Sequence, residues 1–478
     1  MPKRHELLPL AVYAAVLAWL IGLRPLWLDE VLQLVASMQP NAHSAIRWIT
    51  YNPGGAPLGY LAQRVFVLTF GLTPWAARAA PAIFGLLSAA TLLGFARDLK
   101  AGVIAVVLVA FLVTPLQLHY AVEGRPYSQA LFFSLAALWC LWRLAQAPSW
   151  RMAAAYAAFV TAGLYTQPLS AAVQLGALAA IACGGRRRAM WLGGMALAIA
   201  GLLFAPWYFH VRGAWHSGIA ASQFSFSLSP RIPWMLIREI SGGGYVASLS
   251  LLGAATLSWR RADPLARRFL LGSVISGIVC AIAADAMSGY FFAVRQVLFV
   301  LPPLLLLATV WLPRSRREWW QPSLLAIFLL ASLAKDVRYF RSPGEDWPGA
   351  ARALLAATSH GECVVVPSPE PKEMYQLFEP GLRTRFCNAS DAPGPVVIVQ
   401  NRYTLASSLD ESTRVLAAKG LRATSETDVS GVRLLLFLPA SLPGDKGLPE
   451  NKLVDPPQPL PMVPALMRPF RAATIGGG

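Results

Sequence analysis

Residues 76–96, AARAAPAIFGLLSAATLLGFA, form an apolar run long enough to cross a lipid bilayer as one helix. Such a run is helical in a membrane because its backbone groups find no water partners in the hydrocarbon core. Runs of this kind recur along the chain and predict a polytopic α-helical membrane protein with about eleven transmembrane helices. The other ten predicted spans cover residues 7–24, 101–117, 127–143, 152–166, 168–184, 190–209, 245–259, 268–287, 296–312 and 321–339.

The composition of the whole chain agrees with a membrane protein. Of its 478 residues, 56% are hydrophobic and only 14% are charged. The net charge of +17 could indicate nucleic-acid binding, but the basic residues lie in short clusters between apolar segments. We therefore expect no nucleic-acid partner. The N-terminal apolar core is too long for a signal peptide and lacks a small-residue cleavage site, which predicts an uncleaved first span.

The placement of Lys and Arg predicts the orientation of the spans, because cytoplasmic loops carry the basic excess. Basic clusters alternate with loops that are poor in basic residues, and we assign the clusters to the cytoplasm. The outer, periplasmic side then receives the 25–75 loop, QLHYAVEGRPYS, the 210–244 loop, SGYFFAVRQ and all residues beyond about 340. We expect a multi-pass protein of the bacterial inner membrane.

The chain divides into three predicted regions. Residues 1–340 form the transmembrane domain, with amphipathic helices in the first outer loop (25–75). Residues 341–440 form a small periplasmic α/β domain, because apolar strand candidates (ECVVVP, PVVIVQ and RLLLFLP) alternate with polar helical segments. Residues 441–478 are rich in Pro and Gly and predict a disordered tail. Whether Cys363 and Cys387 of the α/β domain form a disulfide is left open.

Two adjacent carboxylates, Asp29 and Glu30, lie within the apolar stretch LWLDEVLQLV at the start of the first outer loop. Ionised groups beside a bilayer are costly, which favours a catalytic role for this pair. The alternative is that Asp29 is the N-cap of an amphipathic helix and that the helix dipole favours Glu30 in its first turn. An N-cap carboxylate can also act as a base, so the two interpretations do not exclude each other.

Further polar candidates lie in two other outer loops. Arg125 in HYAVEGRPYS has the fork of donors that suits a phosphate, and Glu123 and Tyr127 flank it as substrate- or metal-binding candidates. A local ion pair between Glu123 and Arg125 is the alternative. Arg295 opposes the topology rule, which phosphate binding or snorkelling to the lipid surface would explain. The histidines show no paired ligand spacing, so a zinc site is not supported.

The order of six segments resembles that of the GT-C membrane glycosyltransferases. It is similar, more narrowly, to the superfamily of protein mannosyltransferases and lipid A aminoarabinose transferases, known as the family 39 type. The resemblance covers most of residues 1–440 and implies a GT-C fold and an inverting transferase that takes sugar from a polyprenyl-phosphate lipid. The six segments are LWLDE, NPGGAPLGYLAQRVF, LTPWAARAAPAIFGLLSAATLLGFARDL, EGRPYS, FFAVRQVLFVLPPLLLL and EDWPGAARAL.

The resemblance also implies roles for individual residues. Asp29 becomes the candidate base, with Glu30 beside it in acceptor or metal binding. Arg125 and Arg295 match positions that hold the donor phosphate, and Glu123 matches an acidic position in the same loop. Many members carry His-Pro-Pro where this chain has the NPGGAP segment, and a His where it has Gln167. A divalent metal ion as cofactor is therefore left open.

The sequence thus predicts an inverting hexosyl- or pentosyltransferase. Its donor is a polyprenyl-phosphate-linked sugar, and its acceptor is a lipid, glycan or protein on the periplasmic face of the inner membrane. One alternative is a transporter or flippase of lipid-linked sugars, which would carry charged residues within its spans, whereas these spans are nearly free of charge. Another is a non-catalytic membrane assembly protein, for which Asp29 and Glu30 would be replaceable.

Overall fold

The computed structural model describes residues 4–50, 52, 55–220, 229–289, 293–313, 318–342, 344–367, 372–401 and 404–439. These residues belong to two compact units. The first, here called the membrane unit, comprises residues up to 22 and residues 36–339. The second, here called the sheet unit, comprises residues 23–35 and the described residues from 340 to 439. The predicted tail, 441–478, lies outside the described residues.

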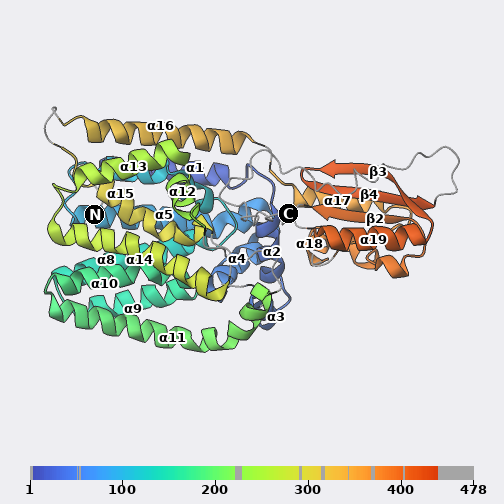
Figure 1. Cartoon of the computed structure of the whole chain (residues 1–478), viewed down its shortest axis with the longest axis horizontal. Helices are drawn as coiled ribbons and strands as arrows, with labels where there is room; N and C mark the ends of the chain where they lie inside the picture. The colour runs from blue at the N-terminus through green and yellow to red at the C-terminus, as the bar shows by residue number, and fades with distance from the viewer. Residues whose placement is uncertain are drawn as a thin grey trace, which may run out of the picture. The chain divides into compact units, whose positions relative to one another are not determined.

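The membrane unit is a bundle of helices that lie side by side (Figure 1). Its helices are α1 (Arg4–Leu20), α3 (Ala42–Thr50), α4 (Pro57–Phe70), α5 (Pro74–Asp98), α6 (Ile104–Leu112), α7 (Pro115–Ala121), α8 (Tyr127–Gln146), α9 (Trp150–Leu164), α10 (Ala172–Cys183), α11 (Arg187–Ala220), α12 (Ile232–Glu239), α13 (Gly244–Ser258), α14 (Pro264–Ser288), α15 (Leu301–Thr309) and α16 (Trp320–Arg341). Two 3₁₀ helices, η1 (Pro168–Ala171) and η2 (Val294–Val300), precede α10 and α15.

Each of the eleven predicted spans coincides with helix in the membrane unit. Among the described residues, four helices are long and apolar enough to cross a membrane: α5, α8, α11 and α14. Two bent pairs, α6 with α7 (64°) and α12 with α13 (83°), raise the number to six if each is one span. The α6–α7 bend falls at Thr114-Pro115, where proline removes a backbone donor and starts a new helix. Eleven complete crossings therefore remain a prediction.

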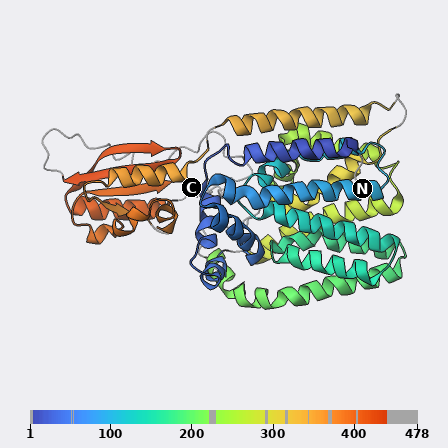
Figure 2. The same ribbon diagram turned by 180° about the vertical axis from the view of Figure 1, so that it is seen from behind.

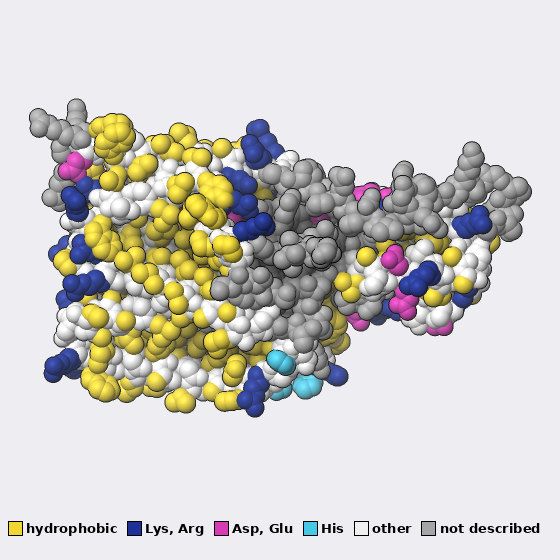
Figure 3. Space-filling model, viewed as in Figure 1, with side chains coloured by type: hydrophobic (Ala, Val, Ile, Leu, Met, Phe, Trp, Pro, Cys, Tyr) yellow, Lys and Arg dark blue, Asp and Glu magenta, His cyan; other side chains and the backbone are white. Residues whose placement is uncertain are grey.

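The surface of the bundle matches a lipid environment. Figure 3 shows apolar side chains spread over one face of the helices, with Lys and Arg gathered near the ends. Large apolar residues are strongly exposed on several helices, among them Trp19 (64%), Leu202 (72%) and Leu330 (69%). Soluble monomers rarely expose contiguous apolar surface on this scale. The chain is a multi-pass membrane protein.

The 25–75 loop contains three helices among its described residues. Two of them, α2 (Leu28–Ser37) and α4, are the helices predicted for this loop. The following helix, α5, is capped by the Thr73 hydroxyl, which accepts a hydrogen bond from the Ala76 N–H (3.1 Å). The sequence analysis missed α3, which begins after Asn41, whose side chain accepts from the Ser44 N–H (2.9 Å).

The sheet unit contains a four-stranded mixed sheet in the order β1-β2-β4-β3. Strand β1 pairs in parallel with β2, and β4 pairs antiparallel with β2 and β3. The three predicted strands correspond to β1, β2 and β4. The elements are β1 (Cys363–Val365), β2 (Val396–Asn401), β3 (Leu421–Val429), β4 (Val432–Pro439), α17 (Trp347–Ala357), α18 (Glu373–Gln376), α19 (Ala406–Ala418), η3 (Pro380–Thr384) and η4 (Ala389–Asp391).

The core of the sheet unit lies between the sheet and its helices. Leu409 and Leu416 of α19 pack against Ile398 and Phe437 on one face of the sheet. Figure 2 shows α17 lying over the sheet. Cys363 and Cys387 form a disulfide (Cα–Cα 6.0 Å), which settles the pairing that the sequence left open.

Candidate functional site

Two arginines from distant parts of the sequence meet at one tyrosine in the membrane unit. Tyr127 is the first residue of α8, Arg125 lies two residues before it, and Arg295 is the second residue of η2. The Tyr127 ring centroid lies 5.7 Å from the Arg125 guanidinium carbon and 6.0 Å from that of Arg295. Both distances are those of cation–π contacts. The structure therefore brings together Arg125, Tyr127 and Arg295, here called the arginine cluster.

The arginine cluster has neighbours that shape its charge. Glu123 is 4% exposed, and its carbonyl accepts a hydrogen bond from the Arg125 N–H (2.7 Å), which closes a tight turn between the two residues. The ring of Tyr120 lies 4.7 Å from that of Tyr127 and packs against the cluster. The cluster places two guanidinium groups at one ring. Such a group suits an anion with several oxygens, because each guanidinium presents a planar fork of donors.

The two carboxylates of the 25–75 loop lie at the N-terminus of α2, within the sheet unit. Helix α2 begins at Leu28, so Asp29 occupies its second position and Glu30 its third. Glu30 is fully buried, and its Oε2 accepts from the Trp27 N–H (3.2 Å), as an acidic residue at the third position of a capping box does. The alternative that Asp29 is the N-cap does not hold, because α2 begins one residue earlier, at Leu28, whereas Glu30 lies in the first turn as that alternative expected.

A third carboxylate, which the sequence analysis missed, completes this helix terminus. Glu345 Oε2 accepts from the Leu28 N–H (3.1 Å) and from the Trp347 indole N–H (3.0 Å), and Glu345 is buried. The Trp347 N–H also donates to the Leu26 carbonyl (3.2 Å). The available signal was the acidic pair before Trp-Pro in EDWPGAARAL, where Asp346 caps α17 through the Gly349 N–H (2.8 Å).

The predicted site residues thus form two groups, one in each unit. Asp29 and Glu30 lie together in the sheet unit, and Glu345 joins them at the start of α2. Glu123, Arg125, Tyr127 and Arg295 lie in the membrane unit, where the arginine cluster connects α8 with η2.

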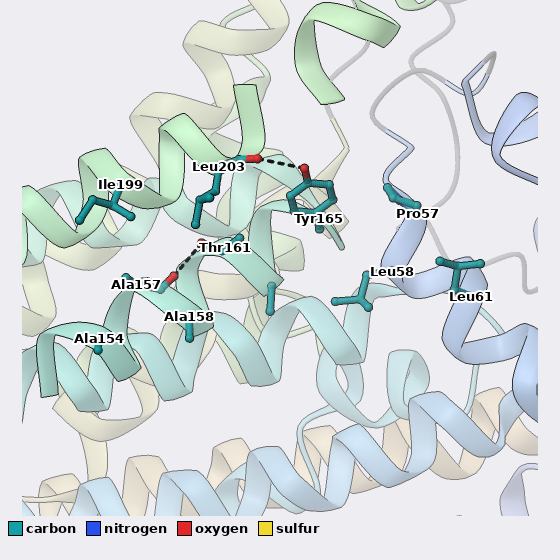
Figure 4. A pocket seen from close by; sticks show the side chains of 11 residues that line it. Pro57, Leu58, Leu61, Ala154, Ala157, Ala158, Thr161, Tyr165, Ile199 and Leu203 are labelled. Carbon is teal, nitrogen blue, oxygen red and sulfur yellow. Dashed lines mark hydrogen bonds between the residues drawn. The ribbon is translucent and has the colours of Figure 1, made fainter. Parts of the chain in front are cut away.

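An apolar pocket of about 700 Å³ opens between α4, α9 and α11 of the membrane unit (Figure 4). Its lining is almost free of available polar groups. The Tyr165 hydroxyl donates to the Leu203 carbonyl (3.0 Å), and the Thr161 hydroxyl donates to the Ala157 carbonyl (2.8 Å). Four of the lining residues are alanines, whose small side chains leave room for a ligand. The lining residues are Pro57, Leu58, Leu61, Ala154, Ala157, Ala158, Thr161, Ala162, Tyr165, Ile199 and Leu203.

The first turn of α4 connects this pocket to the segment that carries the arginine cluster. Leu58 lines the pocket, and its N–H donates to the Tyr165 carbonyl (2.9 Å). The next residue, Gly59, packs against Pro126, and a Cβ at Gly59 would come within 2.4 Å of the proline ring. Pro126 lies between Arg125 and Tyr127. The pocket and the arginine cluster therefore lie on either side of one helical turn.

The described residues contain no group of three or more His, Cys, Asp or Glu side chains that could hold a metal ion. His119 Nε2 instead lies 3.1 Å from Asp336 Oδ1, and its ring stacks on Tyr339 (3.8 Å between centroids). His119 is therefore a buried residue with protein partners inside the bundle. The divalent metal ion remains a prediction.

The architecture is similar to that of solved membrane-protein structures. ArnT from Cupriavidus metallidurans in the apo state superposes with a TM-score of 0.61 at 13% identity, over 90% of this chain and 97% of ArnT. The same protein bound to undecaprenyl phosphate gives a TM-score of 0.60 at 14% identity, with the same coverage. No family model and no curated protein matches the sequence. The chain has the GT-C fold.

The GT-C fold confirms the architecture implied by the order of the six segments. At 13–14% identity, the likeness to ArnT establishes the fold alone.

Proposed function

We propose that this GT-C protein is an inverting glycosyltransferase. It transfers a hexose or pentose from a polyprenyl-phosphate-linked donor to a lipid, glycan or protein acceptor at the periplasmic face of the inner membrane. The observation that carries the proposal is the arginine cluster, where Arg125 and Arg295 lie at one tyrosine ring. The binding of undecaprenyl phosphate by ArnT, a protein of the same fold, supports a lipid phosphate as the ligand.

Arg125 and Arg295 are proposed to hold the phosphate that links sugar to lipid. Guanidinium groups bind phosphate oxygens through paired N–H donors, and cation–π contact with Tyr127 limits the motion of both side chains. The phosphate leaves as the anomeric carbon–oxygen bond breaks, and its charge is stabilised by the arginines. A phosphate leaving group therefore needs little help from a general acid.

The apolar pocket is proposed to hold part of the hydrocarbon chain of the donor. Its available surface is apolar because the Tyr165 and Thr161 hydroxyls donate to backbone carbonyls. A volume of about 700 Å³ suits part of an isoprenoid chain rather than its whole length. The contact between Gly59 and Pro126 places the pocket one turn from the arginine cluster, so a lipid could use both.

Asp29 is proposed to remove the proton of the acceptor hydroxyl as its oxygen attacks the anomeric carbon. Glu30 is engaged with the Trp27 N–H, and Glu345 with the Leu28 N–H, so these two carboxylates hold the start of α2. Asp29 is the second residue of α2, and it matches the position of the base that the family resemblance implies. We assign Glu30 a positioning role beside it.

The test is a transfer assay with the purified full-length protein and a panel of undecaprenyl-phosphate hexoses and pentoses. We expect release of undecaprenyl phosphate together with a new glycosidic bond of inverted configuration. Movement of the lipid across the bilayer without bond formation would instead support a flippase.

The pocket assignment has its own control. Ala158→Phe fills the pocket, and we expect it to weaken undecaprenyl-phosphate donors by about tenfold while leaving donors with a methyl group in place of the isoprenoid chain nearly unchanged. An equal effect on the two kinds of donor would contradict the assignment of the pocket to the isoprenoid chain. Ala153 is buried on the same helix but does not line the pocket, so Ala153→Gly serves as a comparison for loss of helix stability.

A further inference from the structure

Two buried glutamines each hold the backbone next to one arginine of the arginine cluster. Gln63, on α4, is 1% exposed, and Gln296, on η2, is 8% exposed. Neither side chain belongs to the arginine cluster itself. We propose that Gln63 and Gln296 are positioning residues, which set where Arg125 and Arg295 present their guanidinium groups to a lipid phosphate. This inference rests on the phosphate-binding role proposed above.

Gln63 acts on the Arg125 side. Its Nε2 donates to the Gly124 carbonyl (2.9 Å) and to the Ala77 carbonyl on α5 (2.9 Å). Its Oε1 accepts from the Ser37 hydroxyl (2.9 Å). The amide thereby ties the peptide between Glu123 and Arg125 to helix α5, with both of its donors and its acceptor engaged. A loop fixed in this way loses little entropy when it binds an anion.

Gln296 acts on the Arg295 side. Its Oε1 accepts from the Ala293 N–H (2.7 Å), and its Nε2 donates to Asp285 Oδ1 on α14 (3.1 Å). The backbone N–H can only donate, which fixes the orientation of the amide and turns its NH₂ group toward Asp285. Residues 293 and 296 are thus tied together around Arg295, and the pair is anchored to α14.

The hydrogen bond between Gln296 and Asp285 requires a carboxyl group to be buried, which costs free energy of folding. The carboxyl is 3% exposed, and its Oδ2 has no hydrogen-bond partner among the residues that the structure describes. A buried polar atom without a partner destabilises a fold, so packing alone gives no reason for an acid here. The hydrogen bond to Gln296 gives Asp285 a definite task, which is to fix the orientation of that amide.

The geometry explains why two separate clamps are needed. Arg125 and Arg295 come from segments that are far apart in the sequence, and both guanidinium carbons lie within about 6 Å of the Tyr127 ring. One anion can contact both guanidinium groups only if both are held in position. A backbone clamp beside each arginine holds the segment that carries it, which favours binding of an anion between them.

The experiment measures the affinity of undecaprenyl phosphate for the full-length protein in nanodiscs. Gln63→Met and Gln296→Met keep the side-chain volume and remove the hydrogen bonds, and each is expected to weaken binding by about tenfold. Gln174 provides the matched control, since it is 1% exposed and its Nε2 donates to the Ser134 carbonyl (3.0 Å) elsewhere in the bundle. Gln174→Met should lower the melting temperature but change the affinity by less than about twofold.

Double mutants separate positioning from general destabilisation. Gln63→Met should add almost nothing to Arg125→Ala, and Gln296→Met almost nothing to Arg295→Ala, because the positioned group is already gone. The crossed pairs, Gln63→Met with Arg295→Ala and Gln296→Met with Arg125→Ala, should multiply their effects. Effects that multiply in all four combinations would overturn the inference, as would losses no larger than that of Gln174→Met.

Variants of Asp285 test the inference independently, even if Gln63→Met does not fold. Asp285→Asn retains an oxygen that accepts from Gln296 and should bind within about twofold of the parent, whereas Asp285→Leu should lose about fivefold or more. Equal affinities for the two variants would overturn the Gln296 half of the inference. If Arg125→Ala and Arg295→Ala bind as tightly as the parent, the phosphate role itself fails and the inference falls with it. If the arginine variants lose affinity for undecaprenyl phosphate and the glutamine variants bind it as tightly as the parent, the positioning role alone is overturned.

Discussion

The start of α2 and the arginine cluster differ in the sign of the charge that each gathers: carboxylates at the first and guanidinium groups at the second. At the start of α2, Glu30 and Glu345 accept hydrogen bonds from backbone N–H groups, so negative charge meets the positive end of a helix. In the arginine cluster, two positive groups lie at one aromatic ring with Glu123 nearby. The first group holds the start of a helix, whereas the second presents two guanidinium groups at one ring, an arrangement of donors that suits a phosphate.

The largest expected effect tests whether Asp29 differs from its structural neighbours. Asp29→Asn should lower the kcat of sugar transfer by about 10²- to 10⁴-fold with little change in the affinity for undecaprenyl phosphate, because the amide cannot take a proton. Glu30→Gln keeps an oxygen that accepts from the Trp27 N–H and should lower kcat by less than about tenfold. Full turnover in Asp29→Asn, measured in the transfer assay, would remove Asp29 as the base.

The next effect tests whether Tyr127 organises the cations. Tyr127→Leu removes the aromatic face shared by Arg125 and Arg295 and should weaken undecaprenyl phosphate by about tenfold. Tyr127→Phe keeps the ring and should stay within about threefold of the parent. The readout is equilibrium binding of undecaprenyl phosphate, and equal losses in the two variants would show that the hydroxyl rather than the ring matters.

A smaller effect separates folding from binding at the start of α2. Glu345→Leu removes the acceptor for the Leu28 and Trp347 N–H groups and should destabilise the protein by about 1–3 kcal/mol. Glu345→Gln retains an acceptor oxygen and should cost less. Thermal unfolding measures the difference, and a melting temperature of Glu345→Leu equal to that of the parent would contradict the capping role.

The smallest effect concerns pH in the sheet unit. Hydrogen bonds from Asn388 and Ser390 hold the pKa of the exposed Asp391 carboxyl below its usual range. A carboxyl whose pKa is lowered by folding stabilises the protein above its unfolded pKa and loses that contribution as the pH falls through its folded pKa. The melting temperature of Asp391→Asn should therefore differ slightly from the parent at pH 7 and converge with it in acid. A difference that grows in acid would contradict this sign.

Periodic and local features could be predicted from the sequence, whereas contacts across long separations could not. Each apolar run that was predicted to be a span is helical in the structure, and the three shorter apolar runs predicted to be strands are β1, β2 and β4. Strand β3 was missed because its sequence, LRATSETDV, is largely polar and one face is solvent-exposed. Its available signal was the turn that follows, where Ser430 and Gly431 both have positive φ (48° and 93°), as in tight hairpins.

The site shows the same limit. Arg125 and Tyr127 are two residues apart, so their proximity follows from the sequence alone. The contact between Tyr127 and Arg295, and the bond between Gln63 and Gly124, depend on how helices pack. The bond between Leu28 and Glu345 joins residues separated by 317 positions. Such contacts carry no periodic signal, and only the folded chain reveals them.

The most direct test of the central claim compares undecaprenyl phosphate with undecaprenol, which has the same chain and no phosphate. We predict that the parent protein binds the phosphate about 100-fold more tightly, and that Arg125→Ala combined with Arg295→Ala reduces this preference to below about threefold. The affinity for undecaprenol should be unchanged by the arginine substitutions, because the chain is held elsewhere. A preference for the phosphate that persists in the double variant would contradict the assignment of these arginines to the lipid phosphate.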